Sequence, residues 1–451
     1  RSYSVTGVQT CALPISILTA ATCAAQEPRL RLIIETDAGG DPDDEQSMVR
    51  FLLYASEWDI EGIIANRPVA RERENRNPIR DGLGIVRAQV SAYGQCYPNL
   101  VKHDPRYPVP GQLLARTVAG YDDTDDGVQL ILRAVDAPDP RPVWFCNWGT
   151  DHGSAVSCLK RALDRVLQER GPEGYAAFKS RLRLSSYDAF REHTSMQAPA
   201  FPFWVDTFRP PVDGKRWYHR FSALTATAGD FRLERDVRIG HGPLGALYPA
   251  NSGMPQKEGD TMSFLYLVPT GMNDPNQPTW GSWAGRYGAN DEQPGKPYYW
   301  ANQTDTWHGT TQRDNTLARW AVALQNDFRA RLNWCVADDY RKANHRPLAV
   351  LNGDRTRRIL TLAAKPGETV TLTAAGSSDP DGDGLGLIWF LYPEAGSFQG
   401  DIQLSVGHGE TTSFTAPVVQ KPETIHIVLQ VEDNGQPPLC AYRRAVVTVA
   451  P

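Results

Sequence analysis

The sequence predicts an α/β domain, with a mostly parallel sheet and helices on both faces, followed by a small all-β sandwich. Strand-like and helix-like segments alternate from Arg29 to about Ala343, which is the pattern of a parallel sheet covered by helices. After Arg346, apolar and polar residues alternate instead, with turn residues between the runs, as in an antiparallel sandwich. The length of 451 residues fits two or three domains.

Residues 1–26 are not expected to belong to either domain. Val5–Ser16 resembles a translated sequencing-library adapter of the kind that contaminates metagenomic assemblies. Ile17–Gln26 resembles the end of a signal peptide, and its small residues suit cleavage after Ala25. We therefore expect a bacterial protein that is secreted or periplasmic. A lipoprotein anchor at Cys23 is a less favoured alternative.

The elements of the first domain, residues 27–345, follow from the length and spacing of apolar runs. Short apolar runs predict strands at Leu30–Glu35, Ile60–Ala65 and Pro142–Asn147. Amphipathic runs predict helices at Glu45–Ser56, Pro78–Tyr93, Val128–Val135, Ser154–Glu169 and about Asn315–Asp339. Residues 195–310 are less regular and rich in Pro, Gly and aromatic residues. Loops this long inside a domain are usually functional.

The second domain, residues 346–451, is predicted to be an Ig/cadherin-like β-sandwich. Its strands are expected at Thr369–Ala375, Leu387–Tyr392, Thr424–Glu432 and Tyr442–Val449. The segment Ser377–Gly384 resembles the acidic turn of polycystic-kidney-disease-like and cadherin-like modules. Such a turn either binds calcium or is simply solvated, and the solvated turn is favoured. These modules most often serve as spacers or as carbohydrate-contacting surfaces.

The composition is that of an ordinary globular protein, with 22% charged and 41% hydrophobic residues. A net charge of −5 gives no support for a nucleic-acid partner. No segment reaches the ~18 consecutive apolar residues of a transmembrane helix. Twelve Trp and 17 Tyr are common in cores and also suit stacking on sugars. Oligomeric state is left open.

The cysteines do not predict a zinc site, because none has CxxC spacing. Disulfide pairing is also left open. The five that remain after the leader are Cys96, Cys146, Cys158, Cys335 and Cys440.

The most informative segment is residues 35–44, which joins the first strand to the first helix. It carries five acidic residues, Glu35, Asp37, Asp41, Asp43 and Asp44, together with two glycines and a proline. Like charges this close repel, so the loop needs a compensating cation or full solvation. Calcium suits hard carboxylate oxygens in a flexible loop. The alternative is a capped helix start, which is favourable by about 0.3–1 kcal/mol per charge but accounts for only one or two acids.

The loop also resembles the Asp-x-Asp-Pro-Gly-x-Asp-Asp signature of nucleoside hydrolases. More closely, nearly all of the chain after the leader resembles the nucleoside-hydrolase-like family of "cellulose-binding protein Sde182". The segments that carry this resemblance are Pro42–Asp44, Val49–Tyr54, Asp59–Ala65, Gln325–Phe328 and Glu432–Gly435. The resemblance implies a nucleoside-hydrolase-like fold for the first domain.

In nucleoside hydrolases the loop aspartates hold one calcium, which binds the ribose diol and a water, and an aspartate takes a proton from that water. By position, the resemblance implies that Asp37 is a calcium ligand and general base and that Asp44 is a second ligand. Asp43 would contact substrate hydroxyls or the water. Here the loop is longer, since Asp43 lies six residues after Asp37, and Asp41 takes the fourth position as a rival, substrate-binding residue.

Two further metal ligands are implied by the same resemblance. Thr150 lies in a segment that corresponds to the family's strand-end piece, whose carbonyl reaches the metal. The family's distant His-Asp pair has no plain match, and Asp327 is the preferred replacement, with Asp314 behind it.

Asp151 and His152 sit where a strand meets a helix, so they are expected to face the same cleft. His152 is a candidate to protonate a leaving group, or else it caps the helix.

Other residues are candidates for substrate binding. His241 lies between glycines that permit close backbone approach, although an ordinary loop histidine fits as well. Trp280 and Trp283 belong to an aromatic group that either stacks on sugar rings or fills a core. The acidic run at residues 122–126 is interpreted as a solvated, N-capping helix start, with a position lining the cleft as the alternative.

The leading functional hypothesis is an exported calcium-dependent hydrolase that cleaves a glycosidic bond in a carbohydrate or glycoside. A non-catalytic carbohydrate-binding protein on the same fold is the second hypothesis, and true nucleoside hydrolysis is the third. The sugar, the linkage and the stereochemical outcome do not follow from the sequence.

Overall fold

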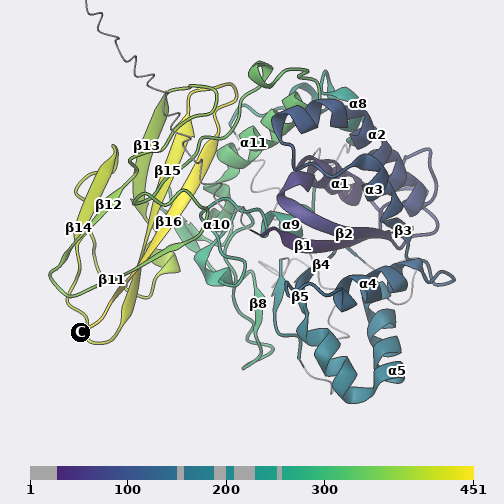
Figure 1. Cartoon of the computed structure of the whole chain (residues 1–451), viewed down its shortest axis with the longest axis horizontal. Helices are drawn as coiled ribbons and strands as arrows, with labels where there is room; N and C mark the ends of the chain where they lie inside the picture. Colours follow the sequence, from purple (N-terminus) through teal and green to yellow (C-terminus); the bar gives the residue numbers. More distant parts are fainter. Residues whose placement is uncertain (1–27, 150–156, 187–199, 208–228, 251–255) are drawn as a thin grey trace, which may run out of the picture.

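The computed structural model describes residues 28–149, 157–186, 200–207, 229–250 and 256–451 (Figure 1). The predicted α/β domain and β-sandwich are both present. Within the described residues, no helix is long and apolar enough to span a membrane. The five cysteines from Cys96 to Cys440 are buried free thiols.

The first domain is built on one eight-stranded sheet in the order β3-β2-β1-β4-β5-β6-β8-β7. All neighbouring strands are parallel except β7 and β8. The strands are β1 (Leu30–Thr36), β2 (Trp58–Ala65), β3 (Thr117–Ala119), β4 (Val143–Asn147), β5 (Leu182–Ser186), β6 (Trp204–Asp206), β7 (Gly288–Ala289) and β8 (Tyr298–Trp300). Because β1 lies between β2 and β4 and is parallel to both, the carboxyl ends of these three strands lie side by side.

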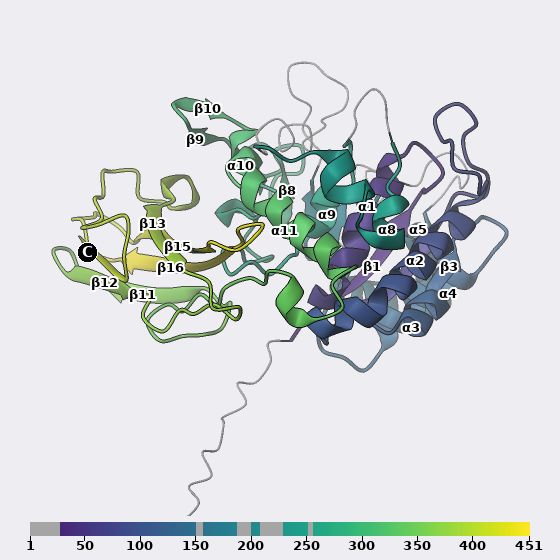
Figure 2. The same ribbon diagram turned by 90° about the horizontal axis from the view of Figure 1, so that it is seen from above.

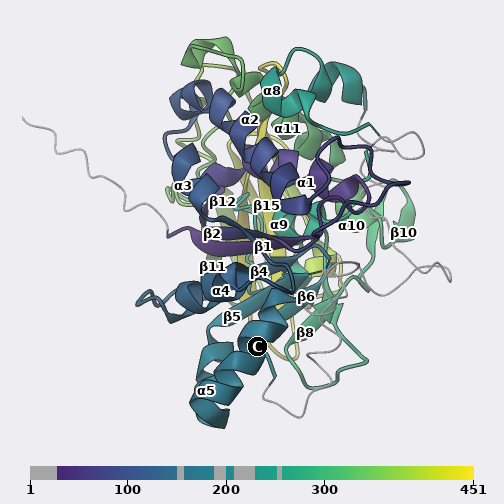
Figure 3. The same ribbon diagram turned by 90° about the vertical axis from the view of Figure 1, so that its right-hand side faces the viewer.

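Helices cover both faces of this sheet, as Figures 1 and 3 show. The helices α1 (Asp43–Leu53), α2 (Gly82–His103) and α3 (Pro110–Ala115) lie on one side. On the other lie α4 (Asp126–Asp136) and α5 (Cys158–Ser180). Side chains alternate along β1, so Leu32 and Ile34 pack in the core with α1 and α2, while Ile33 packs with α4 and α5.

Further helices and strands belong to the first domain. They are α8 (Gly242–Ala246), α9 (Thr261–Leu265), β9 (Asp305–Trp307), β10 (Thr310–Gln312), α10 (Asn315–Ala318) and α11 (Ala321–Trp334). The helix predicted at Asn315–Asp339 is therefore broken into α10 and α11, and it ends earlier. The helix predicted at Pro78–Tyr93 starts later, because the Asp81 side chain caps it by accepting the Gly84 N–H at 2.7 Å.

The C-terminal sandwich has a four-stranded sheet, β11-β16-β15-β13, and a two-stranded sheet, β12-β14. Its strands are β11 (Leu360–Ala364), β12 (Thr369–Thr373), β13 (Leu385–Leu391), β14 (Thr411–Thr415), β15 (Glu423–Asp433) and β16 (Cys440–Val449). Leu372, Trp389, Phe414, Leu429 and Val447 fill the space between the sheets. Figure 2 shows this sandwich beside the first domain, next to α10 and α11.

The two domains share a buried interface. The Asp305 carboxylate accepts a hydrogen bond from Arg286 Nε at 2.7 Å and one from the Tyr392 hydroxyl at 2.6 Å. Gly271 lies against the backbone of β16, and a Cβ there would be 2.0 Å from the Tyr442 carbonyl oxygen. Only glycine permits this approach, so the domains pack as one body at this point.

Candidate metal site

The acidic loop leaves the sheet at the carboxyl end of β1, between the ends of β2 and β4. Asn66 N donates to the Thr36 carbonyl at 3.0 Å, and Trp148 N donates to the Glu35 carbonyl at 2.8 Å. These two bonds hold the three strand ends together. The loop then turns through Gly39, whose φ of +94° favours glycine, and α1 begins at Asp43.

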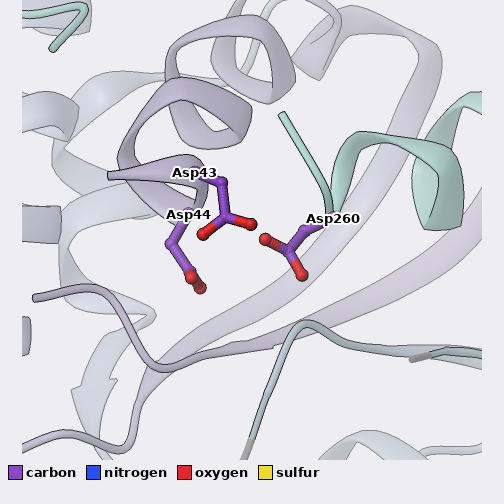
Figure 4. A group of neighbouring side chains, drawn as sticks. All are labelled: Asp43, Asp44 and Asp260. Atoms are coloured by element: carbon purple, nitrogen blue, oxygen red, sulfur yellow. The ribbon is translucent and has the colours of Figure 1, made fainter. Parts of the chain in front are cut away.

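Three carboxylates from two distant parts of the chain converge at this point. Asp43 and Asp44 come from the first turn of α1, and Asp260 directly precedes α9 (Figure 4). One carboxylate oxygen from each lies within 4.8 Å of the others. Asp260 is only 4% exposed, and its Oδ2 has no hydrogen-bond partner among the described residues. We call these three residues the Asp cluster.

Burial and mutual repulsion both disfavour the charged forms of the Asp cluster. Burial, followed by repulsion from neighbouring aspartates, raises the pKa of Asp44 and Asp260 well above the ordinary value. The pKa of Asp43 is raised in the same way, by burial and then by its hydrogen bond to Asp41. Carboxylates arranged like this either hold protons or surround a cation.

Asp37 lies beside the cluster and is held by Arg67. Arg67 Nη2 donates to Asp37 Oδ2 at 2.8 Å, and its Nε donates to the Asp37 carbonyl at 3.1 Å. Burial raises the pKa of Asp37, although Arg67 acts in the opposite direction. Gly149, which follows β4, has a φ of +144°, and a Cβ there would lie 2.7 Å from Asp37 Oδ1. Glycine is therefore required for the two strand ends to meet.

Asp41 is bound to a lysine from the segment that also carries Asp260. The Lys257 ammonium contacts the Asp41 carboxylate and lies 3.3 Å from Asp43 Oδ2. Burial alone would raise the pKa of Asp41, but its hydrogen bond with Asp43 and the charge of Lys257 lower it to about 2. Asp41 is thus an ionised partner of Lys257 and does not belong to the Asp cluster.

A buried network fixes the segment that carries Lys257 and Asp260 against α1. Arg50 Nη2 donates to Glu258 Oε1 at 3.0 Å, and neither side chain is exposed. Gln46 Oε1 accepts the Lys257 N–H at 2.8 Å. The same helix therefore supplies Asp43 and Asp44 and positions the residues that face them.

Glu35, the fifth acid of the loop, has a structural role beneath the site. Its Oε1 accepts the Cys158 N–H at 2.9 Å and the Asn66 Nδ2 donor at 3.3 Å, and Asn147 reaches Oε2 at 3.4 Å. Burial raises its pKa, and these donors oppose the shift. In the capped-helix alternative, Asp43 and Asp44 do lie in the first turn of α1, but the N-cap is Pro42 and no side chain caps the helix. Asp41 Oδ1 accepts the Asp43 N–H at 3.1 Å.

The structure does not bring Asp327 to the Asp cluster, which corrects the predicted distant ligand. Asp327 Oδ1 pairs with Arg331 Nε at 3.0 Å, and Oδ2 pairs with Arg346. Arg331 also binds Glu57, directly before β2, whereas the acidic loop follows β1. Because these strands are parallel, Asp327 lies near the amino ends of the strands, whereas the acidic loop lies at their carboxyl ends.

The predicted substrate-binding aromatics are also placed elsewhere. Trp283 is 1% exposed and packs under the Arg346 guanidinium, so it cannot stack on a sugar in this conformation. Trp280 stands edge-on to His426 of the sandwich, with ring centroids 5.1 Å apart. His241 precedes α8, and its Nε2 lies 3.0 Å from the Arg235 carbonyl. None of these three contacts the acidic loop among the described residues.

Thr150, Asp151 and His152 lie outside the described residues, so their predicted roles stay predictions. Asp260, Lys257 and Arg67 were not predicted. Asp260 has a weak signal, since an aspartate before an apolar run is typical of any helix start. Nothing in the sequence relates it to the loop.

Comparison with protein-family models gives a direct result. Residues 31–287, more than half of the chain, match the family described as "Cellulose-binding Sde182, nucleoside hydrolase-like domain". The chain belongs to this family. Residues 369–449 match the model described as "Cellulose-binding protein Sde0182, C-terminal domain". The predicted resemblance to the Sde182 family is therefore confirmed.

Among solved structures, a nucleoside hydrolase-related hypothetical protein from Saccharophagus degradans is 31% identical to this Sde182 family member. The match covers 93% of this chain and 100% of that chain, with a TM-score of 0.73, and that protein is described as associated with carbohydrate metabolism. A PKD domain matches 20% of this chain and 81% of its own length at 18% identity, but a TM-score of 0.16 does not indicate a shared fold. No curated protein matches the chain.

Proposed function

We propose that this protein is a calcium-dependent hydrolase of a glycosidic bond in a carbohydrate or glycoside. The observation that carries the proposal is the Asp cluster. No basic side chain forms an ion pair with Asp44 or Asp260 in the part of the chain that the structure describes, and Asp260 Oδ2 is buried without a partner. A buried set of acids with this deficit of positive charge calls for a cation.

The donor set fits calcium. Asp43, Asp44 and Asp260 would hold the ion, with Asp37 beside them, and all offer the hard carboxylate oxygens that calcium prefers. When bound, a divalent ion lowers the pKa of a water molecule and orients sugar hydroxyls.

The side chains around the ion have separate proposed roles. Asp37 is the proposed general base, because Arg67 holds its Oδ2 at 2.8 Å beside the Asp cluster. Lys257 keeps Asp41 ionised at the rim, where Asp41 is a proposed hydrogen-bond acceptor for substrate hydroxyls. Water attack forms a bond to the anomeric carbon as the bond to the leaving group breaks, and the water proton passes to Asp37. The leaving group departs with the bonding electron pair and takes up a proton from solvent.

The substrate class rests on the relatives. The family is described as cellulose-binding, and the Saccharophagus protein is described as associated with carbohydrate metabolism. A secreted or periplasmic location, expected from the leader-like segment, is consistent with a carbohydrate substrate. We therefore favour sugars over free nucleosides.

The test combines metal binding and turnover on the full chain. Calcium titration by calorimetry is expected to show one tight site that disappears in Asp44→Asn. Turnover of aryl glycosides, cello-oligosaccharides, inosine and uridine is then measured with and without chelator. Loss of turnover in chelator, restored by calcium, supports the proposal. Turnover that survives chelation or Asp44→Asn contradicts it, and turnover confined to inosine and uridine would replace it with nucleoside hydrolysis.

A second candidate is a carbohydrate-binding protein without catalysis. It is favoured by the Lys257 ammonium, which already supplies one cation to Asp41 and Asp43 of the lengthened loop. Retention on insoluble cellulose, with no sugar released over long incubation in calcium, would identify this function.

A further inference from the structure

Two cavities between the domains share a pair of arginines. The larger, about 670 Å³, lies between the start of β1, the segment around Trp280 and residues 355–361. The smaller, about 330 Å³, lies between residues 346–349 and β16. Arg355 and Arg357 line both cavities, and we call the two together the arginine cavity.

The arginine cavity carries more positive than negative charge. The smaller part is lined by Arg346, Arg355, Arg357 and Arg443, and no carboxylate is among its described lining residues. In the larger part, Glu57 already accepts Arg331 at 2.5 Å and Arg357 at 3.3 Å. Asp274 is the other acid there.

Arg355 is the least compensated of these cations. Arg355 is exposed and forms no ion pair or hydrogen bond with any described residue. Arg357 donates to the Pro269 carbonyl at 3.0 Å and lies 3.3 Å from Glu57, and its side chain stays 40% exposed, so it can also reach a ligand. A cavity with surplus guanidinium groups is built to receive an anion.

An aromatic ring completes the wall. Trp280 lines the larger part and is partly exposed, and its ring is roughly perpendicular to that of His426, at an interplanar angle of 77°. Indole faces pack on the apolar faces of sugar rings, while guanidinium groups pair with carboxylates in two parallel hydrogen bonds. The combination of tryptophan and arginine matches a carboxylated sugar better than a simple inorganic anion.

This region is distinct from the Asp cluster. Arg29 and Leu30, at the start of β1, line the larger cavity, whereas the acidic loop follows the last residue of β1. The seven residues of β1 separate the two places by roughly 20 Å. A ligand in the arginine cavity therefore does not occupy the proposed catalytic site.

We propose that the arginine cavity binds an acidic oligosaccharide, with uronate carboxylates on Arg355 and Arg357 and a sugar ring against Trp280. The site adds a glycan-binding function at the domain interface that does not depend on the proposed hydrolysis.

The test is calorimetric titration of the full chain with a galacturonate trimer and, separately, with cellotriose. The wild type is expected to bind the galacturonate trimer, and more weakly as salt is added. Arg355→Glu should weaken this binding about tenfold or more, because an unpaired cation becomes an anion in the cavity. Trp280→Ala should weaken it about fivefold or more through lost stacking. Arg341→Glu, an equal charge change on an exposed residue that pairs with Asp339, should stay within about twofold.

Three outcomes overturn the proposal. One is an absence of galacturonate binding, and another is equal affinity of the wild type and Arg355→Glu. The third is displacement of the trimer by sulfate at equal concentration with no effect of Trp280→Ala, which would show a plain anion site. Asp44→Asn should leave galacturonate binding unchanged, so failure of the catalytic proposal is distinguishable from failure of this one.

Discussion

Arg50 of α1 and Glu258, two residues before Asp260, form an ion pair that is completely removed from solvent. The Glu258 carboxylate also accepts hydrogen bonds from the Tyr248 hydroxyl at 2.7 Å and from Thr261 Oγ1 at 2.9 Å. The pair joins the helix that carries Asp43 and Asp44 to the segment that carries the third acid. The geometry of the Asp cluster therefore depends on a contact outside it.

Arg50→Met is expected to lower the free energy of unfolding by about 3–5 kcal/mol, because it leaves the Glu258 carboxylate buried without its cation. Urea unfolding followed by tryptophan fluorescence measures this change. The control is Arg165→Met, which removes an exposed pair with Asp125 and should cost less than about 1 kcal/mol. Similar costs for the two variants would show that the buried pair is not an anchor.

Asp260→Asn is expected to weaken calcium binding by about 100-fold or more, because it removes one of three proposed ligands. Asp327→Asn is the matched control, since Asp327 pairs with Arg331 and Arg346 at the opposite end of the strands. It should destabilise the fold but leave calcium affinity unchanged. Calorimetry of the two variants separates ligand loss from general instability, and loss of affinity only in Asp327→Asn would reverse the assignment.

Calcium affinity is expected to rise with pH over a range in which the affinity of sites built from ordinary carboxylates no longer changes. Burial and mutual repulsion raise the pKa of Asp43, Asp44 and Asp260, so protons compete with the ion above the usual range for aspartate. Titrations from about pH 5 to about pH 8, in buffers of different ionisation enthalpy, should show proton release that decreases as pH rises. Constant affinity and no proton release over this range would contradict the expectation.

Stability is expected to fall in acid because of His426. Burial, then the nearby Arg444 and Arg286 charges, lower the pKa of this buried histidine from 6.5 to about 3. Between these values the unfolded chain binds a proton that the folded chain excludes, so stability rises with pH by up to about 1.4 kcal/mol per unit. His426→Gln should flatten this slope in unfolding experiments, whereas His408→Gln, on an exposed residue, should not. An unchanged slope in His426→Gln would refute the assignment.

The parts of the site that are local in sequence were predictable. Asp37, Asp43 and Asp44 lie between the end of one strand and the start of a helix. In a parallel sheet this segment lies at the carboxyl ends of the strands, where ligands usually bind. Asp260 and Lys257 were not predictable, because their approach depends on the path of an irregular segment held by Arg50 and Gln46. Contacts of this kind have no period or spacing that a single sequence displays.

The aromatic residues show a second limit of the sequence. Trp280 and Trp283 are three residues apart and equally suited to stacking on a sugar. The sandwich and Arg346 bury Trp283, whereas Trp280 stays partly open in a cavity wall. The different exposure of these two residues results from packing between the domains, which the sequence does not display. In the sandwich, β12 and β14 keep the alternating pattern, because each has one buried face. In contrast, β15 is buried on both faces, since Ile427 and Leu429 pack in the sandwich and Val428 packs against the first domain.

Because acids gather beyond one end of β1 and the arginines of the arginine cavity lie near the other, we expect charge to be separated along this strand. An approaching polyanion experiences a torque that turns the arginine end toward it before any contact forms. A neutral glycan experiences no such torque and must find its site by unbiased collisions. Ionic strength should therefore slow the association of acidic chains and leave neutral chains unaffected, so salt would select which glycan the protein meets first.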